Sequence, residues 1–337
     1  MKNKKMKIAR REKDLSQEQL ARQVYVDKYN VTRHLTRLEE AGYVFLKEQE
    51  SWNVVKGGKY YTMRNQSSVL AFNIGENVEK PVFAMSASHS DSPVFKVKPN
   101  AVLNRGGMVR LNVEAYGGMI MSSWMDRPLA LAGRVLVKKD AGFESRLFAK
   151  KDCCMMPNMA IHLNRGANEG QKFNVQVDML PVVALDEKEF NFSGYLAEEM
   201  QVAKEDILGY DLVITNGDSG KLWGSHEEFI TSARLDDLEC AYGTLQGFLE
   251  ASNPERINVY CCFDNEEVGS RTRQGADSTL LSGTLSRICA SLGYTEAQLV
   301  QGITESFMVS ADNAQGFHPN HPELSDEGNN VKLNQGV

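Results

Sequence analysis

The stretch from Ile257 to Phe263, INVYCCF, is a run of seven mostly apolar residues that stops at a charged segment. The acidic segment Asp264–Glu267, DNEE, follows it directly. A short apolar run bounded by turn-forming residues favours a strand that is buried on both faces. Two adjacent glutamates at the end of such a strand repel each other unless solvent or a cation compensates their charge. The end of this strand must therefore either be exposed to solvent or lie in a site that binds a cation.

Length and composition are those of a globular protein. The 337 residues are enough for about two domains, each with a sizeable core. Hydrophobic residues make up 42% and charged residues 24% of the chain, which excludes disordered and collagen-like classes. No apolar run approaches the roughly 18 residues of a membrane span, and no apolar signal segment follows the basic N-terminus. We therefore expect a protein without a membrane partner.

The cysteines give a further indication of the compartment. They lie at positions 153, 154, 240, 261, 262 and 289, so that two pairs are neighbours in the sequence. This layout is a poor one for a disulfide framework and lacks the C-x-x-C spacing of a zinc site. The sequence predicts a reduced, cytoplasmic protein.

The first 37 residues differ from the rest in charge. They hold eleven Lys or Arg against four Asp or Glu, whereas the remaining chain holds 27 bases and 40 acids. Residues 15–44 read as two amphipathic helices with a short break. This pair resembles the helix-turn-helix of winged-helix regulators, in which the side chains facing DNA would be Lys28, Asn30, Thr32 and Arg33. An amphipathic helical pair with a solvated basic face explains the same residues equally well.

Beyond this head, predicted strands alternate with predicted helices, which favours an α/β fold. The strands are expected at 52–55, 59–63, 69–74, 82–86, 257–263 and 306–310, and the helices at about 238–248 and 284–292. Between about 100 and 225, segments such as LAGRVLVKKD and FNVQVDMLPVVAL predict a β-rich insertion. The expected domains are a head at 1–37, a catalytic domain at 38–98 and 228–337, and the insertion at 99–227.

Four motifs with acidic or histidine side chains fall at predicted strand ends. They are SHSDSP from position 88, SARLDDLE from 232, FDNEEVGS from 263 and SADNAQG from 310. Each is weak alone, because an isolated acid is usually a turn former or a surface charge. Ligands in open α/β sheets bind at the carboxyl ends of strands. Carboxylates that converge there repel one another, and a bound cation would neutralise their charge. Histidine with carboxylates and without thiolates suits zinc in a hydrolytic site, where one of two adjacent glutamates binds metal and the other acts as a base.

Taken together, the motifs resemble those of the aspartyl aminopeptidases, a family of dinuclear zinc exopeptidases. HSDSP, RLDDLE, DNEEVGS and SADNAQGFHPNHPE occur in family order, with GGKYY, RNQSSVLAF, WMDRPLALAGRV and MPNMAIHLNR around them. The resemblance runs from about residue 38 to residue 337. It implies a zinc-exopeptidase-like mixed sheet flanked by helices, with an inserted β-rich oligomerisation domain. It also implies removal of an N-terminal Asp or Glu from peptides by a homo-oligomer, usually a dodecamer.

The resemblance also assigns the metal ligands. His89 and Asp312 would bind the first zinc, Asp236 would bridge two zinc ions, and Glu267 would bind the second. The family continues past the LNQGV motif with a histidine that completes the second zinc site, so we expect a C-terminally truncated sequence whose second zinc is weakly held or absent.

Three further roles follow from the same resemblance. Glu266 would be the general base, and Asp91 would orient the imidazole of His89. His162 would reach into the active site of a neighbouring subunit, the alternative being a loop histidine with a structural hydrogen bond. Two other functions remain open at this point: a DNA-binding regulator with an inactive peptidase-like body, and an inactive fragment.

Overall fold

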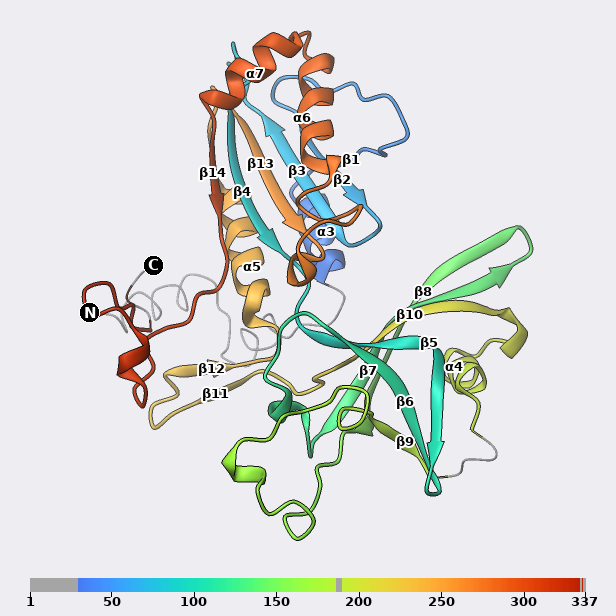
Figure 1. Cartoon of the computed structure of the whole chain (residues 1–337). Helices are drawn as coiled ribbons and strands as arrows, with labels where there is room; N and C mark the ends of the chain where they lie inside the picture. Colours follow the sequence, from blue (N-terminus) through green and yellow to red (C-terminus); the bar gives the residue numbers. More distant parts are fainter. Residues whose placement is uncertain (1–29, 186–189, 334, 336–337) are drawn as a thin grey trace. The chain divides into compact units, whose positions relative to one another are not determined.

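The structure, a computed structural model, describes residues 30–185, 190–333 and 335. These residues form two compact units (Figure 1). Unit 1 comprises residues 92–233, and unit 2 comprises residues 30–91 together with the described residues from 234 onward. The predicted mixed α/β class is confirmed: unit 2 is a sheet flanked by helices, and unit 1 is built mainly of strands.

Among the described residues, a six-stranded mixed sheet forms the centre of unit 2. Its spatial order is β1 (Val44–Phe45), β2 (Lys59–Arg64), β3 (Ser68–Ile74), β13 (Ile257–Phe263), β4 (Phe83–His89) and β14 (Phe307–Ser310). β3 runs antiparallel to β2 and β13, whereas β13, β4 and β14 are parallel to one another. The carboxyl ends of β4, β13 and β14 therefore lie at the same edge of the sheet.

The strand β13 is buried along its whole length, as its apolar sequence predicts. Its side chains alternate between the two faces of the sheet. Ile257, Val259, Cys261 and Phe263 belong to one core cluster, whereas Tyr260 and Cys262 belong to another.

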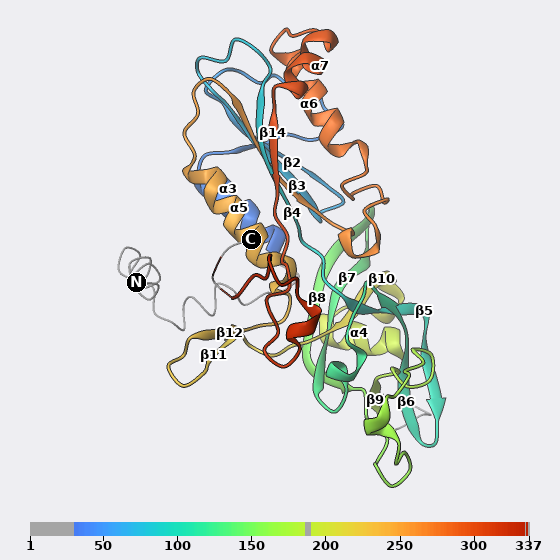
Figure 2. The ribbon, with the colours of Figure 1, turned by 60° about the vertical axis from the view of Figure 1, so that its left-hand side comes forward.

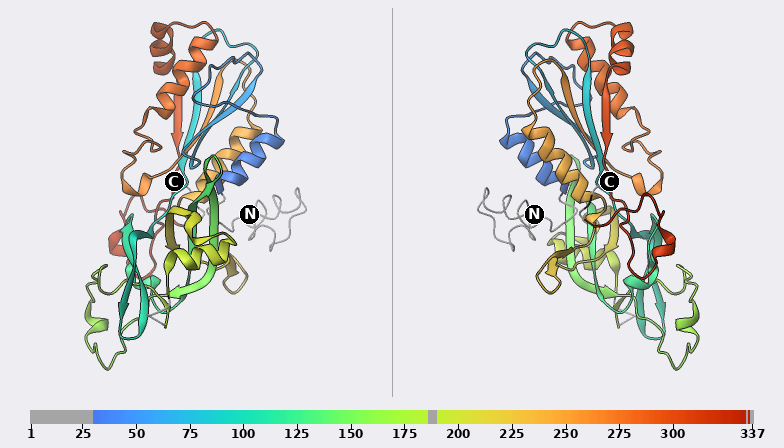
Figure 3. Two further views of the ribbon diagram at one scale, coloured as in Figure 1. Left: turned by 90° about the vertical axis from the view of Figure 1, so that its right-hand side faces the viewer. Right: turned by 90° about the vertical axis from the view of Figure 1, so that its left-hand side faces the viewer.

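Helices cover each face of the sheet. α6 (Thr279–Ser291) and α7 (Glu296–Thr304) bury Leu285, Ile288 and Leu299 in the first cluster. α5 (Leu235–Glu250) and α3 (Asn30–Glu40) supply the second cluster, and Figures 2 and 3 show these two helices side by side on the opposite face from α6. The result is a three-layer α/β/α unit.

One predicted strand is wrong. Residues 52–55 form no strand, because their groups are bonded to helix α6 instead of to a neighbouring strand. The backbone N–H of Val54 donates to Ser291 Oγ at 2.8 Å, and the guanidinium of Arg287 lies 3.8 Å from the centre of the Trp52 ring. Tertiary packing has here overridden the strand preference of the sequence.

The second helix of the predicted helix-turn-helix is observed as α3, while the first helix and Lys28 lie outside the described residues. Leu38 of α3 is fully buried, and Gly42, with φ of 82°, follows the helix end. His34 Nδ1 lies 3.1 Å from the hydroxyl of Tyr260 on β13. α3 is thus packed into unit 2, and the predicted boundary between residues 37 and 38 falls inside it.

Unit 1 contains a closed β-barrel. Its strands are, in spatial order, β10 (Ile207–Thr215), β5 (Val94–Arg105), β6 (Met108–Tyr116), β9 (Val182–Ala184), β8 (Gly142–Met155) and β7 (Pro128–Lys139). The helix α4 (Phe192–Met200) contributes Phe192 and Leu196 to the barrel core. The other two strands described in unit 1, β11 (Lys221–Trp223) and β12 (Phe229–Thr231), form an antiparallel hairpin. Five short 3₁₀ segments occur in the described chain: Met121–Trp124, Ala167–Glu169, Lys204–Asp206, Glu266–Val268 and Pro322–Leu324.

The segment FNVQVDML, which contributed to the prediction of a β-rich insertion, forms no strand itself. Residues 175–178 form a turn that is held by side-chain bonds. The backbone N–H of Asn174 donates to the Asp178 carboxylate, and the N–H of Asp178 donates to the Asn174 carbonyl, each at 2.7 Å. Asn and Asp side chains commonly compete in this way with strand pairing.

We predict that His34 makes the protein sensitive to acid. Burial, helped by the positive charge of Arg37, lowers the pKa of His34 from 6.5 to about 4. Between these two pH values the unfolded chain binds a proton that the folded chain does not, so the free energy of unfolding falls as the pH drops, by up to about 3 kcal/mol at ~1.4 kcal/mol per pKa unit. The melting temperature between pH 7 and 4 should fall less in His34→Gln than in the wild type. His226→Gln, at an exposed histidine, is the control. An equal fall in melting temperature for all three proteins would show that His34 is not the source of the acid sensitivity.

Candidate metal centre

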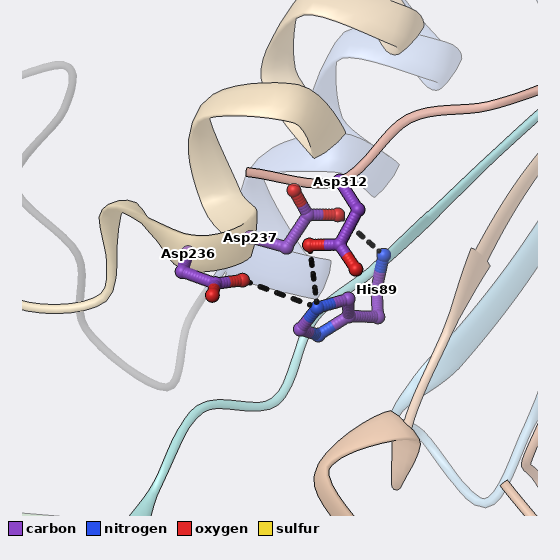
Figure 4. Close-up of side chains that lie close together, drawn as sticks. All are labelled: His89, Asp236, Asp237 and Asp312. Carbon is purple, nitrogen blue, oxygen red and sulfur yellow. Dashed lines mark hydrogen bonds and ion pairs between the residues drawn. The ribbon is translucent and has the colours of Figure 1, made fainter. Parts of the chain in front are cut away.

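Four side chains meet at the carboxyl edge of the unit 2 sheet (Figure 4). His89 is the last residue of β4, and Asp312 lies two residues beyond the end of β14. Asp236 and Asp237 stand at the start of α5, where their backbone angles are not helical. The parallel alignment of β4 and β14 is what brings His89 and Asp312 together.

The imidazole of His89 is the centre of the group. Its Nε2 atom lies 3.3 Å from Asp236 Oδ1 and 3.6 Å from Asp312 Oδ1. One donor atom from each of these residues and from Asp237 lies within 4.8 Å of the others. His89 and Asp237 are buried, whereas the side chains of Asp236 and Asp312 are about half exposed. The cluster is therefore buried on the side of His89 and Asp237 and accessible to solvent on the side of Asp236 and Asp312.

Asp237 is fully buried, which is unusual for a carboxylate. Its Oδ2 accepts the backbone N–H of His89 at 2.9 Å, while its Oδ1 has no hydrogen-bond partner among the described residues. Burial raises the pKa of Asp237 to about 6, although the bond from the His89 amide acts in the opposite direction. A buried oxygen without a partner costs on the order of 1–3 kcal/mol.

Asp91 connects His89 to the adjacent glutamates. Its backbone oxygen lies 3.1 Å and its Oδ1 3.4 Å from His89 Nδ1. The same carboxylate accepts the backbone N–H groups of Glu266 at 3.0 Å and of Glu267 at 3.1 Å. These two residues begin a 3₁₀ turn after β13, and the first N–H groups of such a turn have no partner within it. Asp91 therefore fixes both the imidazole and the turn that carries the two glutamates.

The two glutamates differ in surroundings. Glu266 is about half exposed, and its Oε2 lies 3.8 Å from His89 Nε2. Glu267 is less exposed, and burial, together with the negative charges of Asp91 and Asp236, raises its pKa to about 7. Both carboxyl groups thus lie beside the cluster, but in different environments.

The electrostatics of the cluster are those of a cation site. Burial opposes the charged form of His89, but the bond to Asp91 and the charges of Asp237, Asp91 and Glu266 outweigh it and raise the pKa to about 9. Burial and the neighbouring Asp312 raise the pKa of Asp236. Carboxylates that repel one another around one imidazole nitrogen are stabilised by a divalent cation. An imidazole with carboxylate oxygens and no thiolate fits zinc.

Six of the seven residues proposed from the sequence lie around this cluster in unit 2: His89, Asp91, Asp236, Glu266, Glu267 and Asp312. The seventh, His162, lies in an exposed turn of unit 1. Sequence reasoning missed Asp237. The only available signal was its position beside Leu238, at the start of the apolar face formed by Leu238, Ala241 and Leu245.

A histidine and carboxylates gathered at the carboxyl edge of a three-layer α/β sheet define a metal-dependent enzyme centre. A sequence model of the M18 peptidases, described as aminopeptidase I zinc metalloprotease, matches residues 25–337. The chain belongs to this family of zinc metalloproteases.

Individual relatives agree with this assignment. The "Probable M18 family aminopeptidase 2" of Clostridium novyi is 41% identical over 308 residues, which are 89% of this chain and 71% of the relative. The Ape4 and Nbr1 complex contains a chain that is 31% identical with a TM-score of 0.83, over 91% of this chain and 64% of that one.

Two further solved structures have the same fold. Chaetomium thermophilum mApe1 is 29% identical with a TM-score of 0.82, over 91% of this chain and 76% of that one. The S. cerevisiae mApe1 dodecamer is 25% identical with a TM-score of 0.77, over 94% and 76%.

DNA and membranes were the other partners considered from the sequence. The family match starts at residue 25 and so includes α3, and the DNA-binding alternative is not favoured. No helix in the described part of the chain has the length and apolar character needed to cross a membrane.

Removing one of the clustered carboxylates should remove the metal. We expect Asp236→Ala to lower the zinc content of the purified protein to less than half of the wild-type value, because its Oδ1 is the carboxylate oxygen nearest to His89 Nε2. Elemental analysis after dialysis measures this. Asp140→Ala, in the exposed turn between β7 and β8, is the matched control. Equal zinc in both variants would show that the cluster is not the metal site.

Proposed function

We propose that the protein is an aminopeptidase that removes the N-terminal residue, preferentially Asp or Glu, from peptides. Membership of the M18 family supports the class of reaction. The observation that carries the proposal is the link from His89 through Asp91 to Glu266. It holds a half-exposed carboxylate beside a metal-binding cluster, which is the arrangement that water-mediated hydrolysis of a peptide bond requires.

The ligands can be divided between two zinc ions. His89, Asp236 and Asp312 would hold one ion, and Asp236 with Glu267, a set of only two ligands, would hold a second ion weakly. When bound, zinc supplies Lewis-acid polarisation of the scissile carbonyl and lowers the pKa of water. Asp237 holds the backbone of His89 in place, because its Oδ2 accepts the His89 N–H.

Glu266 is the proposed general base. It takes a proton from the attacking water and returns it to the nitrogen of the leaving peptide. The two hydrogen bonds to Asp91 hold the backbone that carries Glu266, so its carboxylate needs little reorganisation to reach the water. Asp91 also holds the ring of His89, with Nε2 directed at Asp236 and Asp312.

Replacing Glu266 tests this assignment. We expect Glu266→Gln to lower kcat/KM for a peptide with N-terminal Asp by ~10²–10⁴-fold, the usual contribution of a general base, while zinc content stays unchanged. Glu79→Gln, an exposed residue, is the control. A variant that keeps more than a tenth of the activity would exclude Glu266 as the base. Cleavage of N-terminal Leu as fast as N-terminal Asp would remove the proposed acidic preference but not the aminopeptidase class.

We further propose that the active protein is a homo-oligomer, as the S. cerevisiae mApe1 dodecamer is, and that His162 acts in the site of a neighbouring subunit. Its exposed position in unit 1 agrees with a role outside its own subunit.

Mixing two inactive variants tests the shared site. His162→Ala and Glu266→Gln should each be inactive alone, but oligomers reassembled from both should recover part of the activity. Recovery occurs because some sites then contain Glu266 from one subunit and His162 from another. Native mass spectrometry confirms that mixed oligomers have formed. Mixed oligomers without recovered activity would contradict a role of His162 between subunits.

A further inference from the structure

The chain contains two pairs of neighbouring cysteines, and the structure places them differently. Cys261 and Cys262 lie in the regular strand β13, where adjacent side chains point to opposite faces of the sheet. Cys261 packs in the core cluster with α6 and α7, and Cys262 in the cluster with α3 and α5. These two sulfur atoms therefore cannot act together.

Cys153 and Cys154 lie at an irregularity of the barrel strand β8. Leu129 of β7 pairs with Cys154 and Leu131 pairs with Lys150, so that three residues of β8 face a single residue of β7. Asp152, within this bulge, has a φ of 51°. Bulges of this kind change the direction of the side chains that follow them.

Both cysteines of the bulge pack against the same core cluster of the barrel, unlike Cys261 and Cys262. Both are directed at the carbonyl oxygen of Leu129, with Sγ at 3.7 Å for Cys153 and 4.0 Å for Cys154. Neighbouring cysteines of a strand thus form a pair of adjacent sulfur atoms.

Cys153 and Cys154 are among the residues that line an open pocket of unit 1 with a volume of about 520 Å³. Its lining residues are mainly apolar and include Met108, Met155 and Val182, with Asp152 as a charged member. Cys154 is buried and Cys153 is partly exposed. The lining of this pocket therefore combines two cysteines with two methionines, Met108 and Met155.

We propose that Cys153 and Cys154 form a dithiol site that binds one thiophilic ion, of the soft class that includes Cu(I) and trivalent arsenic. Thiolate and thioether sulfur select such ions, whereas the histidine and carboxylates of the His89 cluster select zinc and harder ions. The two sites lie in different units and take different classes of ion. This inference does not depend on the proposed peptidase activity.

The ionisation of the pair supports this binding. The hydrogen bond from Cys154 lowers the pKa of the Cys153 thiol, in spite of its burial, and the nearby charge of Lys150 acts in the same direction. Cys153 thus supplies the first thiolate. Cys154, whose pKa is raised by its bond to Cys153 and by burial, loses its proton when the ion binds.

An organic trivalent arsenical is a direct probe of this geometry. Phenylarsine oxide, in its hydrated form with two hydroxyl groups on arsenic, forms two As–S bonds with a dithiol. Each thiol gives up its proton and each As–OH bond breaks, so two waters leave and no oxidant or reductant is needed. A single thiol forms only one such bond, which excess glutathione readily exchanges.

The experiment uses the full-length protein with one equivalent of phenylarsine oxide in excess glutathione. Mass spectrometry should show one phenylarsenic group per chain, which 2,3-dimercaptopropanol removes. Trypsin should place it on the peptide of residues 152–165, which contains Cys153 and Cys154. Absence of the adduct, or its location on residues 257–271 with the other cysteine pair, would overturn the proposal. Because this mapping uses the wild type, it does not depend on the folding of any variant.

Variants and Cu(I) complete the test. Cys153→Ser and Cys154→Ser should each weaken retention of the arsenical against glutathione by ~100-fold, the order of effect expected when a second intramolecular bond is lost. Cys240→Ser should leave retention unchanged. One equivalent of Cu(I) should be held against a chromophoric Cu(I) chelator by the wild type and by Cys240→Ser, but not by either pair variant. Retention of arsenical or Cu(I) by the pair variants, or failure of the wild type to hold Cu(I), would contradict the site.

Discussion

The repulsion between carboxylates around His89 is the constraint on which the functional edge of unit 2 depends. Parallel strands β4, β13 and β14 end at the same place, so the residues that follow them are forced together. Asp236, Asp237 and Asp312 surround one imidazole, and the pKa values of Asp236 and Asp237 are raised as a consequence of burial and mutual charge. A cation is the simplest way to offset this cost, and the M18 family is a family of zinc metalloproteases.

Asp91 gives this cluster its order. It holds the ring of His89 and also takes the two backbone N–H groups at the start of the turn that carries Glu266 and Glu267. One carboxylate therefore couples the end of β4 to the end of β13. The same carboxylate thereby positions a metal ligand, His89, and the backbone of the candidate base, Glu266.

Much of this could be predicted from the sequence where the signal is local. The apolar run Ile257–Phe263 predicts β13 with its observed bounds, and the acidic motifs at strand ends predict the site edge. Asp237 could not be predicted, because its partner is the backbone of His89 on a distant strand. Residues 52–55 were predicted wrongly for the same reason: Ser291 of α6 accepts a bond that a neighbouring strand would otherwise take. The two cysteine pairs look alike in the sequence, and only the bulge in β8 distinguishes them.

Anomalous scattering on both sides of the zinc absorption edge would locate zinc directly in crystals of the protein. We expect a strong anomalous peak within coordination distance of His89 Nε2, bounded by carboxylate oxygens of Asp236 and Asp312. A second peak beside Glu267 would add the other ion of the proposed pair. Zinc-loaded crystals with no anomalous peak next to His89 would show that the His89 cluster is not the zinc site.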